Sequence, residues 1–283
     1  MQAKLLYKKL DEDFIKPGLK DEWVKYMNEI KGFLCENFKS REMGLVCDFT
    51  DEIKRVYTAV FPSEKVMQKI LGDKIENAML FVHHPSIWDI RKAPKIFYQM
   101  NRKLLEEFKE RKISIYSLHV PLDNFGEYST SVTLAEALGI KIEKPCSPYY
   151  NSFAGIIGIS PCKTVQELKE IFAKAVGHEV KLYNYGSKLI KNRKVAVLAG
   201  GGNNLEYLQD VFAEGVKTII TGVSVRNEFS EKTHAYEEAN KINILGGTHY
   251  STEKFACQKI CKYFEKLGLF SEFIEDEPIM EDI

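Results

Sequence analysis

The stretch NAMLFVHH, residues 77–84, is an apolar run that ends in two adjacent histidines and is followed by a proline. A short apolar run of this kind is typical of a buried β-strand. In α/β proteins, ligands bind beyond the carboxyl ends of the strands, where the connecting loops converge. His83 and His84 are therefore predicted to lie where a binding site forms, and they are two of only six histidines in the chain.

Strands and helices alternate on both sides of this stretch, which predicts an α/β fold with mainly buried strands. Strands are expected at 53–60, 77–84, 113–120, 153–160, 193–200, 217–222 and 242–247. Helices are expected over the first thirty-odd residues and at 62–71, 94–111, 130–138, 164–176, 205–215 and 249–267. The turn-rich segment 144–152 is expected to be a boundary, and the acidic tail 275–283 is expected to be frayed.

The charge balance, the apolar runs and the cysteines of the chain limit which classes of protein it can belong to. Forty basic residues balance forty acidic ones, so a nucleic-acid or acidic-membrane partner gains no support from charge. The first residues contain no apolar stretch typical of a secretory signal, so none is expected. No run of eighteen apolar residues occurs, so no membrane span is expected either. Six scattered cysteines fit a reducing cytosol, which predicts a cytoplasmic protein. Cys257 and Cys261 are interpreted as core-facing thiols, with a thiolate metal pair as the less favoured alternative.

Two further predicted strands lead into histidine and carboxylate residues. HVPLD holds His119 and Asp123, and HYSTE holds His249 and Glu253. Adjacent side chains on an extended chain point apart, so the two neighbouring histidines suit two different metal ions or a bent loop. Imidazole and carboxylate donors without thiolate suit Zn, Fe, Mn, Co or Ni.

The glycine-rich stretch AGGGNN, residues 199–204, lies between an expected strand and an expected helix. Its backbone N–H groups could hold a phosphate at the start of the helix. A tight turn that needs positive φ is the favoured interpretation, because the stretch lacks the lysine of a P-loop and is not GxGxxG.

Four segments together carry a family resemblance: GLVCDFTDEIKRVYTAVFPSE (44–64), FVHHP, HVPLDN and GTHYSTE. Their order and spacing resemble the dinuclear metal-centre hexameric protein family, whose members include type-2 GTP cyclohydrolase I-like and NGG-interacting-factor-like proteins. The resemblance covers about residues 25–268. It implies that two divalent metal ions per chain are bound by His83, His84, Asp123, His249 and Glu253. His119 matches a histidine near the metals whose role in the family is less settled.

The resemblance also implies an architecture of two similar intertwined α/β lobes, with mixed sheets flanked by helices. The first lobe would join residues 1–127 to 241–283, the second would span 128–240, and six chains would form a toroidal homohexamer. The sequence departs from the family at three places: Pro121 stands inside HVPLD, Thr248 precedes His249, and TGVSVRNE replaces the usual Thr-Gly-Glu. No site residue is assigned to Glu228 or His234 for this reason.

Five protein donors leave coordination positions open on two metals, which is a mark of catalytic sites. We therefore predict a dinuclear metal-dependent hydrolase acting on a nucleotide or phosphate ester, type-2 GTP cyclohydrolase-like by resemblance, with a small-molecule substrate. The alternative is a non-catalytic metal-handling or regulatory protein that acts through a hexameric ring. His119 is the catalytic candidate, as an orienting group or proton shuttle. Water is the expected nucleophile, with Ser251 instead satisfying backbone N–H groups.

A phosphate-bearing substrate would need basic groups beside the metals. Arg91 and Lys92, just after HHPSIWD, are candidates for that role. The same two residues are equally consistent with a solvated helix start.

Overall fold

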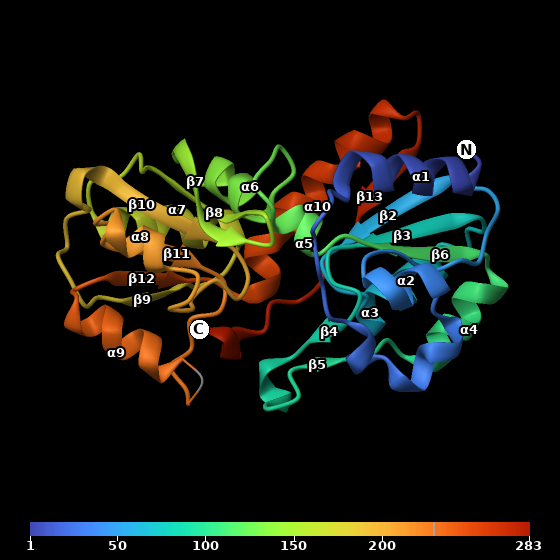
Figure 1. Cartoon of the computed structure of the whole chain (residues 1–283), viewed down its shortest axis with the longest axis horizontal. Helices are drawn as coiled ribbons and strands as arrows, with labels where there is room; N and C mark the ends of the chain where they lie inside the picture. The colour runs from blue at the N-terminus through green and yellow to red at the C-terminus, as the bar shows by residue number, and fades with distance from the viewer. Residues whose placement is uncertain (229) are drawn as a thin grey trace. The chain divides into compact units, whose positions relative to one another are not determined.

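The computed structural model describes residues 1–228 and 230–283 and divides the chain into two compact units (Figure 1). The first unit comprises Met1–Leu122 and Cys257–Glu277, and the second comprises Asp123–Ala256 and Pro278–Ile283. Each unit is built on one mixed sheet with helices on its faces, which confirms the α/β class and the intertwined chain path. Among the described residues, no helix is both long and apolar enough to cross a membrane.

The first unit has a five-stranded sheet in the order β1-β6-β3-β2-β13. The strands are β1 (Gly44–Cys47), β2 (Arg55–Ala59), β3 (Ala78–Val82), β6 (Ile113–Ser117) and β13 (Phe270–Phe273). Only β1 runs antiparallel to its neighbour. A two-stranded ribbon of β4 (Ile87–Trp88) and β5 (Phe97–Tyr98) extends from the loop after β3.

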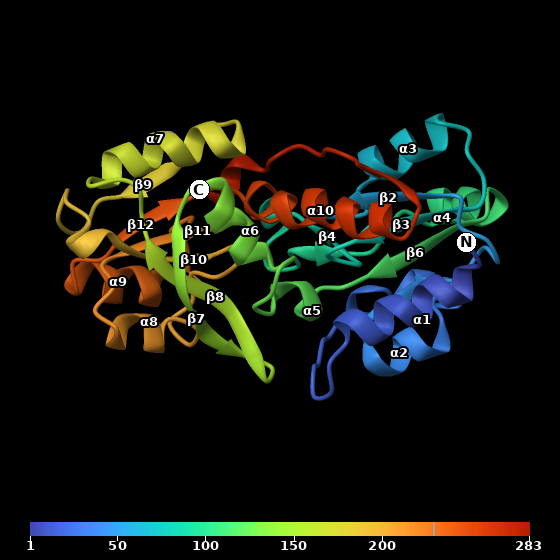
Figure 2. The ribbon, with the colours of Figure 1, turned by 90° about the horizontal axis from the view of Figure 1, so that it is seen from above.

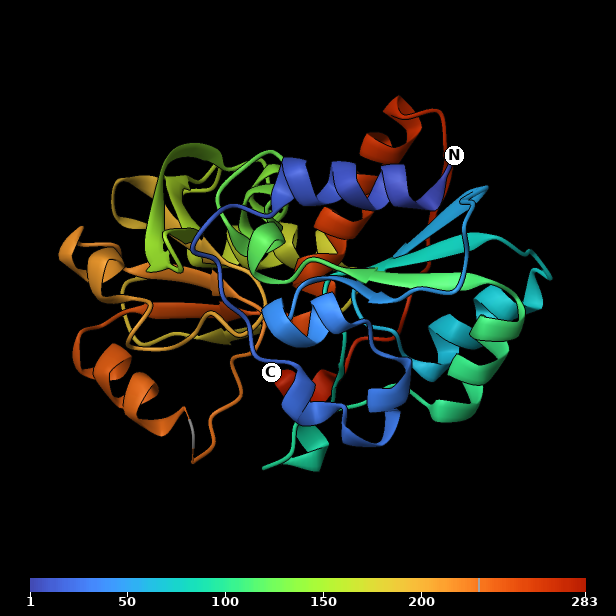
Figure 3. The ribbon, with the colours of Figure 1, turned by 45° about the vertical axis from the view of Figure 1, so that its right-hand side comes forward.

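Helices cover both faces of this sheet, so its strands are buried on both sides. α1 (Ala3–Phe14) and the last turns of α10 (His249–Lys266) lie over one face (Figures 1 and 3). α2 (Glu36–Arg41), α3 (Glu64–Gly72) and α4 (Arg102–Glu110) lie over the other. In β3, Leu80 and Val82 join the core beneath α2–α4, while Phe81 packs against Phe264 of α10. The predicted buried strand at 77–84 is thus confirmed, and it ends just before the two histidines.

The second unit has a six-stranded sheet in the order β7-β8-β10-β11-β12-β9. The strands are β7 (Lys141–Tyr149), β8 (Ser152–Ile159), β9 (Lys181–Tyr183), β10 (Lys194–Leu198), β11 (Thr218–Thr221) and β12 (Asn243–Gly246). The central β10, β11 and β12 are parallel, and the remaining pairs are antiparallel.

Helices also cover both faces of this second sheet. α6 (Thr130–Ala137) and α7 (Val165–Val176) pack on one face, and α8 (Gln209–Ala213) and α9 (Glu231–Ala239) lie on the other (Figure 2). The predicted helix at 164–176 is confirmed as α7, and a capping box begins it, since Thr164 and Glu167 bond reciprocally.

The predicted helix at 94–111 is wrong in its first half. Phe97 and Tyr98 form β5, and α4 begins only after Asn101, whose side chain accepts the N–H groups of Lys103 and Leu104. Phe97 packs on Trp88 across the ribbon, with ring centroids 5.2 Å apart. Pairing with a segment ten residues away outweighs the helical spacing of the apolar residues.

Two other local expectations also fail. The segment 144–152 is not a boundary but the hairpin between β7 and β8, turned by Tyr150 and Asn151 with φ of 42° and 63°. The N-terminal helix ends at Phe14, and the next buried residues lie on or beside the 3-10 turns Val24–Tyr26 and Asn28–Phe33: Ile30 is within the second turn, and Trp23, Met27 and Leu34 flank the two. Those apolar side chains still face the core, because a 3-10 turn also returns every third residue to one side.

The cysteines behave as the composition indicates. All six are free, and five are buried. Cys257 donates its thiol hydrogen to the carbonyl oxygen of Ala59 at 3.3 Å, and the Cys261 sulfur lies 3.3 Å from the Thr58 hydroxyl. Both are therefore core thiols of the first unit, as predicted.

Candidate metal centre

Three histidines meet at the carboxyl edge of the first sheet. His83 and His84 directly follow β3, and His119 comes two residues after β6. β3 and β6 are parallel neighbours, so their carboxyl ends lie side by side. The ring centroids are 4.3 Å apart for His83–His84, 4.7 Å for His84–His119 and 5.2 Å for His83–His119. One ring nitrogen from each lies within 4.8 Å of the others, close enough to share an ion.

Hydrogen bonds fix two of these rings. His83 donates from Nδ1 to the carbonyl oxygen of Leu118 at 3.0 Å, so Nε2 carries a lone pair. His119 Nδ1 lies 3.0 Å from a carboxylate oxygen of Asp21, which likewise leaves Nε2 as the outward nitrogen. A carbonyl or carboxylate behind an imidazole orients the ring and raises its basicity, and metal-binding histidines almost always have one.

Asp21 is a candidate site residue that the sequence did not reveal. Burial would raise the pKa of this carboxyl, but the charge and hydrogen bond of His119 lower it below its usual value. Asp21 is therefore an ionised acceptor for His119. The two residues are 98 positions apart, so no local pattern could have joined them.

Aromatic rings enclose the three histidines. Phe61 stacks on His84 at 4.7 Å, and Trp23 meets His84 and His119 edge-on at 5.5 and 4.9 Å. His83 and His84 are almost completely buried. The three imidazoles therefore lie within an apolar shell.

A second pair of donor residues lies in the second unit, on the first turn of α10. His249 and Glu253 are four residues apart, and Nε2 of the histidine is 3.2 Å from Oε1 of the glutamate. Both side chains are buried. Ser251 accepts the backbone N–H of Thr248 at 3.1 Å, which is the structural role predicted for it. The structure thus contains buried histidine and glutamate groups that could bind a metal ion.

The C-terminal segment takes part in this arrangement and is not frayed as predicted. Asp282 is fully buried, and its carboxylate accepts the backbone N–H of His249 at 2.8 Å. Its carbonyl oxygen accepts the N–H groups of Ser224 and Val225. These bonds explain why an acidic segment is ordered: the start of α10 offers N–H groups that an acidic side chain satisfies well.

Gly200, in the glycine-rich stretch, lies against the same pair. Its φ of 63° confirms the interpretation as a turn that requires positive φ. A Cβ at this position would overlap Oε1 of Glu253 and would come within 3.1 Å of His249 Nε2. Glycine therefore makes room for the glutamate as well as for the turn.

Asp123 ends the short helix α5 (Val120–Asp123) and is the first residue of the second unit. Its carboxylate accepts a hydrogen bond from the Thr130 hydroxyl at 3.0 Å. The six predicted site residues are thus found as a group of three histidines in the first unit, a His–Glu pair in the second, and Asp123 at the start of the second.

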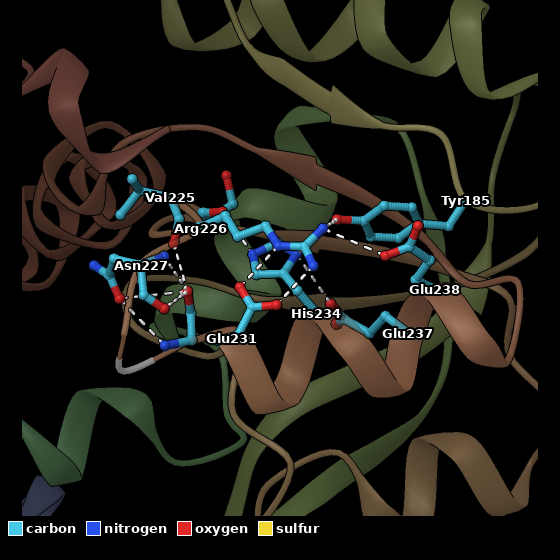
Figure 4. Close-up of polar contacts among 10 residues, drawn as sticks. Tyr185, Val225, Arg226, Asn227, Glu231, His234, Glu237 and Glu238 are labelled. Atoms are coloured by element: carbon cyan, nitrogen blue, oxygen red, sulfur yellow. Dashed lines mark hydrogen bonds and ion pairs between the residues drawn. The ribbon is translucent and has the colours of Figure 1, made fainter.

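Of the other residues considered from sequence, Arg91 is engaged by its own neighbour. The Asp89 carboxylate accepts hydrogen bonds from Nε and Nη2 of Arg91 at 2.7 and 3.1 Å. This pairing favours the interpretation of Arg91 as part of a solvated helix start. His234, to which no ligand role was assigned, uses both ring nitrogens in the second unit (Figure 4). Its Nε2 donates to the carbonyl oxygen of Ser224 at 3.0 Å, and Nδ1 accepts from the Tyr185 hydroxyl at 3.1 Å.

Residues 21–277 match the profile of the family described as Duf34/NIF3 (NGG1p interacting factor 3). The chain belongs to the DUF34/NIF3 family. The resemblance drawn from the histidine motifs is thereby confirmed. Among DUF34/NIF3 relatives, a Pyrococcus horikoshii protein named GTP cyclohydrolase 1 type 2 homolog is 27% identical over 261 residues, covering 91% of this chain and 98% of that protein. A Yersinia pestis protein of the same name is 27% identical over 235 residues, covering 82% and 88%.

Solved structures agree on the fold. A structural-genomics structure of protein ybgI, described as of unknown function, matches with a TM-score of 0.75 at 19% identity, covering 99% of this chain and all of that one. Reduced HcgD from Methanocaldococcus jannaschii matches with a TM-score of 0.67 at 24% identity, covering 98% of each chain.

Proposed function

We propose that this DUF34/NIF3 chain is a dinuclear metal-dependent hydrolase that acts on a nucleotide or phosphate ester. The name GTP cyclohydrolase 1 type 2 homolog, carried by its relatives, supports this reaction class. The observation that carries the proposal is the buried histidine group, in which a backbone carbonyl and a carboxylate orient two of the rings and one nitrogen from each ring lies within 4.8 Å of the others. Two divalent ions, chosen from Zn, Fe, Mn, Co or Ni, would be held by His83, His84, Asp123, His249 and Glu253.

The donor chemistry fits such ions, since neutral imidazoles and carboxylates are their usual protein ligands. When bound, two divalent ions supply charge stabilisation at a phosphoryl or carbonyl oxygen and a lowered pKa for water. The chain itself supplies the rest. His119 can take up or release a proton at Nε2, Asp21 holds its Nδ1, and the rings of Trp23 and Phe61 keep bulk water from the imidazoles.

Metal content tests the ligand set. Elemental analysis of the purified chain should give two ions per chain, and the double variant His84→Ala, Glu253→Ala should lose most of them. His178→Ala is the matched control, because His178 is half-buried, contacts the neighbouring Glu179 carbonyl and is in none of the possible metal-donor groups found among the described residues. Unchanged metal content in the double variant would refute the ligand set.

Turnover tests the activity. The metal-loaded protein should hydrolyse at least one member of a panel of nucleotides and phosphomonoesters. That activity should vanish with chelator and in Asp123→Ala. If the fully loaded protein shows no turnover across a broad panel while binding a specific protein partner, a metal-handling or regulatory role becomes the better account.

We further propose that the protein is cytoplasmic, in keeping with six free cysteines, and that it forms a homohexamer. Light scattering should then give six times the 32.5 kDa mass of one chain. A monomer at working concentration would refute the ring.

A further inference from the structure

A pocket of about 670 Å³ lies wholly within the first unit, beside the ribbon of β4 and β5. Two kinds of side chain dominate its lining, lysines and aromatic rings: Lys25, Lys92 and Lys95 with Tyr26, Phe97 and Tyr98. Its volume falls in the range of small-molecule sites. None of these six residues belongs to the proposed metal ligands.

Phe97 separates this pocket from the histidine group. It lines the pocket, and its ring centroid is 5.9 Å from that of His84 and 5.1 Å from that of Trp23. Tyr26, also in the lining, is 5.5 Å from Phe97. A ligand seated here would therefore lie one aromatic ring away from an imidazole of the proposed centre.

The charge in the pocket favours an anion. Lys92 and Lys95 are exposed, and within the described part of the chain neither has a carboxylate within 4.0 Å. Lys25 is paired with Glu22 at 2.6 Å, so its charge is largely offset. The acidic lining residue Glu29 accepts a hydrogen bond from Gln99 at 2.8 Å. With Lys92 and Lys95 against the single carboxylate of Glu29, the lining keeps a net positive charge.

The aromatic side chains of the pocket lining offer a second kind of contact to a ligand, by stacking. Tyr26, Phe97 and Tyr98 are half-buried and present aromatic surface to the pocket. The ammonium of Lys92 lies 3.3 Å from the centroid of the Tyr98 ring, so positive charge and stacking surface occur at one place. Flat aromatic ligands stack on such rings, and phosphates bind to such lysines.

We propose that this pocket binds a phosphorylated aromatic ligand of the nucleotide class. Lys92 and Lys95 would contact the phosphate, and the ring would stack on the aromatic wall formed by Tyr26, Phe97 and Tyr98. The assignment of this ligand as the substrate rests on the proposed hydrolase function, whereas its binding does not require the metals. Lys92, one of the two basic candidates in the sequence, thereby receives a role, and Arg91 does not.

Tryptophan fluorescence offers a direct readout of occupancy. The chain has only two tryptophans, and both pack against Phe97, Trp23 at 5.1 Å and Trp88 at 5.2 Å. GMP should cause a saturable change in emission, both in the metal-loaded protein and after chelator treatment. Guanosine should bind more weakly. Inorganic phosphate should compete with GMP while changing the emission little.

Charge variants identify the pocket. Lys92→Gln with Lys95→Gln should weaken GMP binding about tenfold in the chelated protein, and metal content should stay unchanged. The control is Lys103→Gln with Lys109→Gln on α4, which removes the same charge from exposed lysines that do not line the pocket. Equal GMP affinity in the two double variants would overturn the proposal, as would phosphate binding as tightly as GMP.

The two proposals can fail separately. Hydrolysis of p-nitrophenyl phosphate without any GMP binding would overturn the pocket and leave the hydrolase function standing. Binding of GMP that depends on Lys92 and Lys95, without turnover of any ester, would support the pocket and count against the hydrolase function.

Discussion

His119 with Asp21 in the first unit, and His234 with Glu237 in the second, are two buried histidine–carboxylate pairs of opposite character. The first pair is a hydrogen bond of 3.0 Å, and the pKa of Asp21 is lowered. The second pair is separated by 3.6 Å, and burial raises the pKa of Glu237 to about 8. Burial also lowers the pKa of His234, so the second pair is neutral at pH 7 and the Asp21 carboxylate is ionised.

The other partners of each ring account for the difference. His119 turns Nδ1 to the Asp21 carboxylate, whereas the two nitrogens of His234 are engaged by Ser224 and Tyr185. Glu237 therefore receives no hydrogen from the ring that faces it. Proximity of a histidine and a carboxylate is not enough to make a functional pair; the tautomer set by third groups decides.

The largest effect is expected at His119. His119→Ala should lower kcat by about 10²–10⁴-fold, because a general acid or base contributes that much, and metal content should fall less. His234→Gln should leave kcat within a few-fold. Steady-state kinetics with parallel elemental analysis measure both. Comparable losses of kcat in the two variants would break the contrast between the pairs.

The next effect is on stability and belongs to Glu237. Because its folded-state pKa lies above the unfolded value, its contribution to stability is fully present below about pH 4.5 and is lost as pH rises toward 8. Glu237→Gln, which cannot ionise, should therefore raise the free energy of unfolding by about 2–4 kcal/mol at pH 9 and by little at pH 4. Urea unfolding at the two pH values tests this. A pH-independent difference would show that Glu237 is ionised in the folded protein.

A smaller effect is expected at Asp21. Asp21→Ala removes the acceptor behind His119 and should lower activity or metal affinity by about 10–100-fold, the usual consequence of losing such a partner. Asp21→Asn retains an acceptor oxygen but no charge, so its activity and metal affinity should lie between those of Asp21→Ala and the parent protein. If Asp21→Ala matches the parent in turnover and metal titration, the carboxylate has no positioning role.

The smallest effect is expected at Ser251. Ser251→Ala removes the oxygen that accepts the Thr248 N–H at the start of α10. It should cost about 1 kcal/mol of stability and leave kcat nearly unchanged, since water is the expected nucleophile. Thermal unfolding and kinetics together check this. A loss of turnover as large as that of His119→Ala would point to a covalent serine intermediate instead.

Local signals in the sequence predicted the fold where they were strong. Helix α3 begins after Ser63 and α7 after Thr164, where capping side chains bond backbone N–H groups. The histidines at 83, 84 and 119 were predicted to share one region because parallel strands bring their ends together, and they do. These features depend on neighbours in the chain or on a general property of α/β sheets.

Features that depend on distant partners were missed. The ribbon of β4 and β5 formed where helical spacing predicted a helix, since pairing across the ribbon is invisible to periodicity. Asp21 lies 98 residues from His119, and Asp282 lies 33 residues from His249. The residues next to Asp21 and Asp282 in the sequence do not indicate the partner of either one. The acidic composition of the tail instead predicted a frayed end.

Gly200 offers a way to disable the second group of donors without altering a donor atom. A methyl group at this position would displace the Glu253 carboxylate, the movable end of a flexible side chain, while the turn would also be strained. The substitution would mainly shift Oε1 of Glu253 and would leave the protein core largely unchanged. A mutational survey should therefore reject every replacement at position 200, and a reader of that survey could mistake this backbone position for a binding residue.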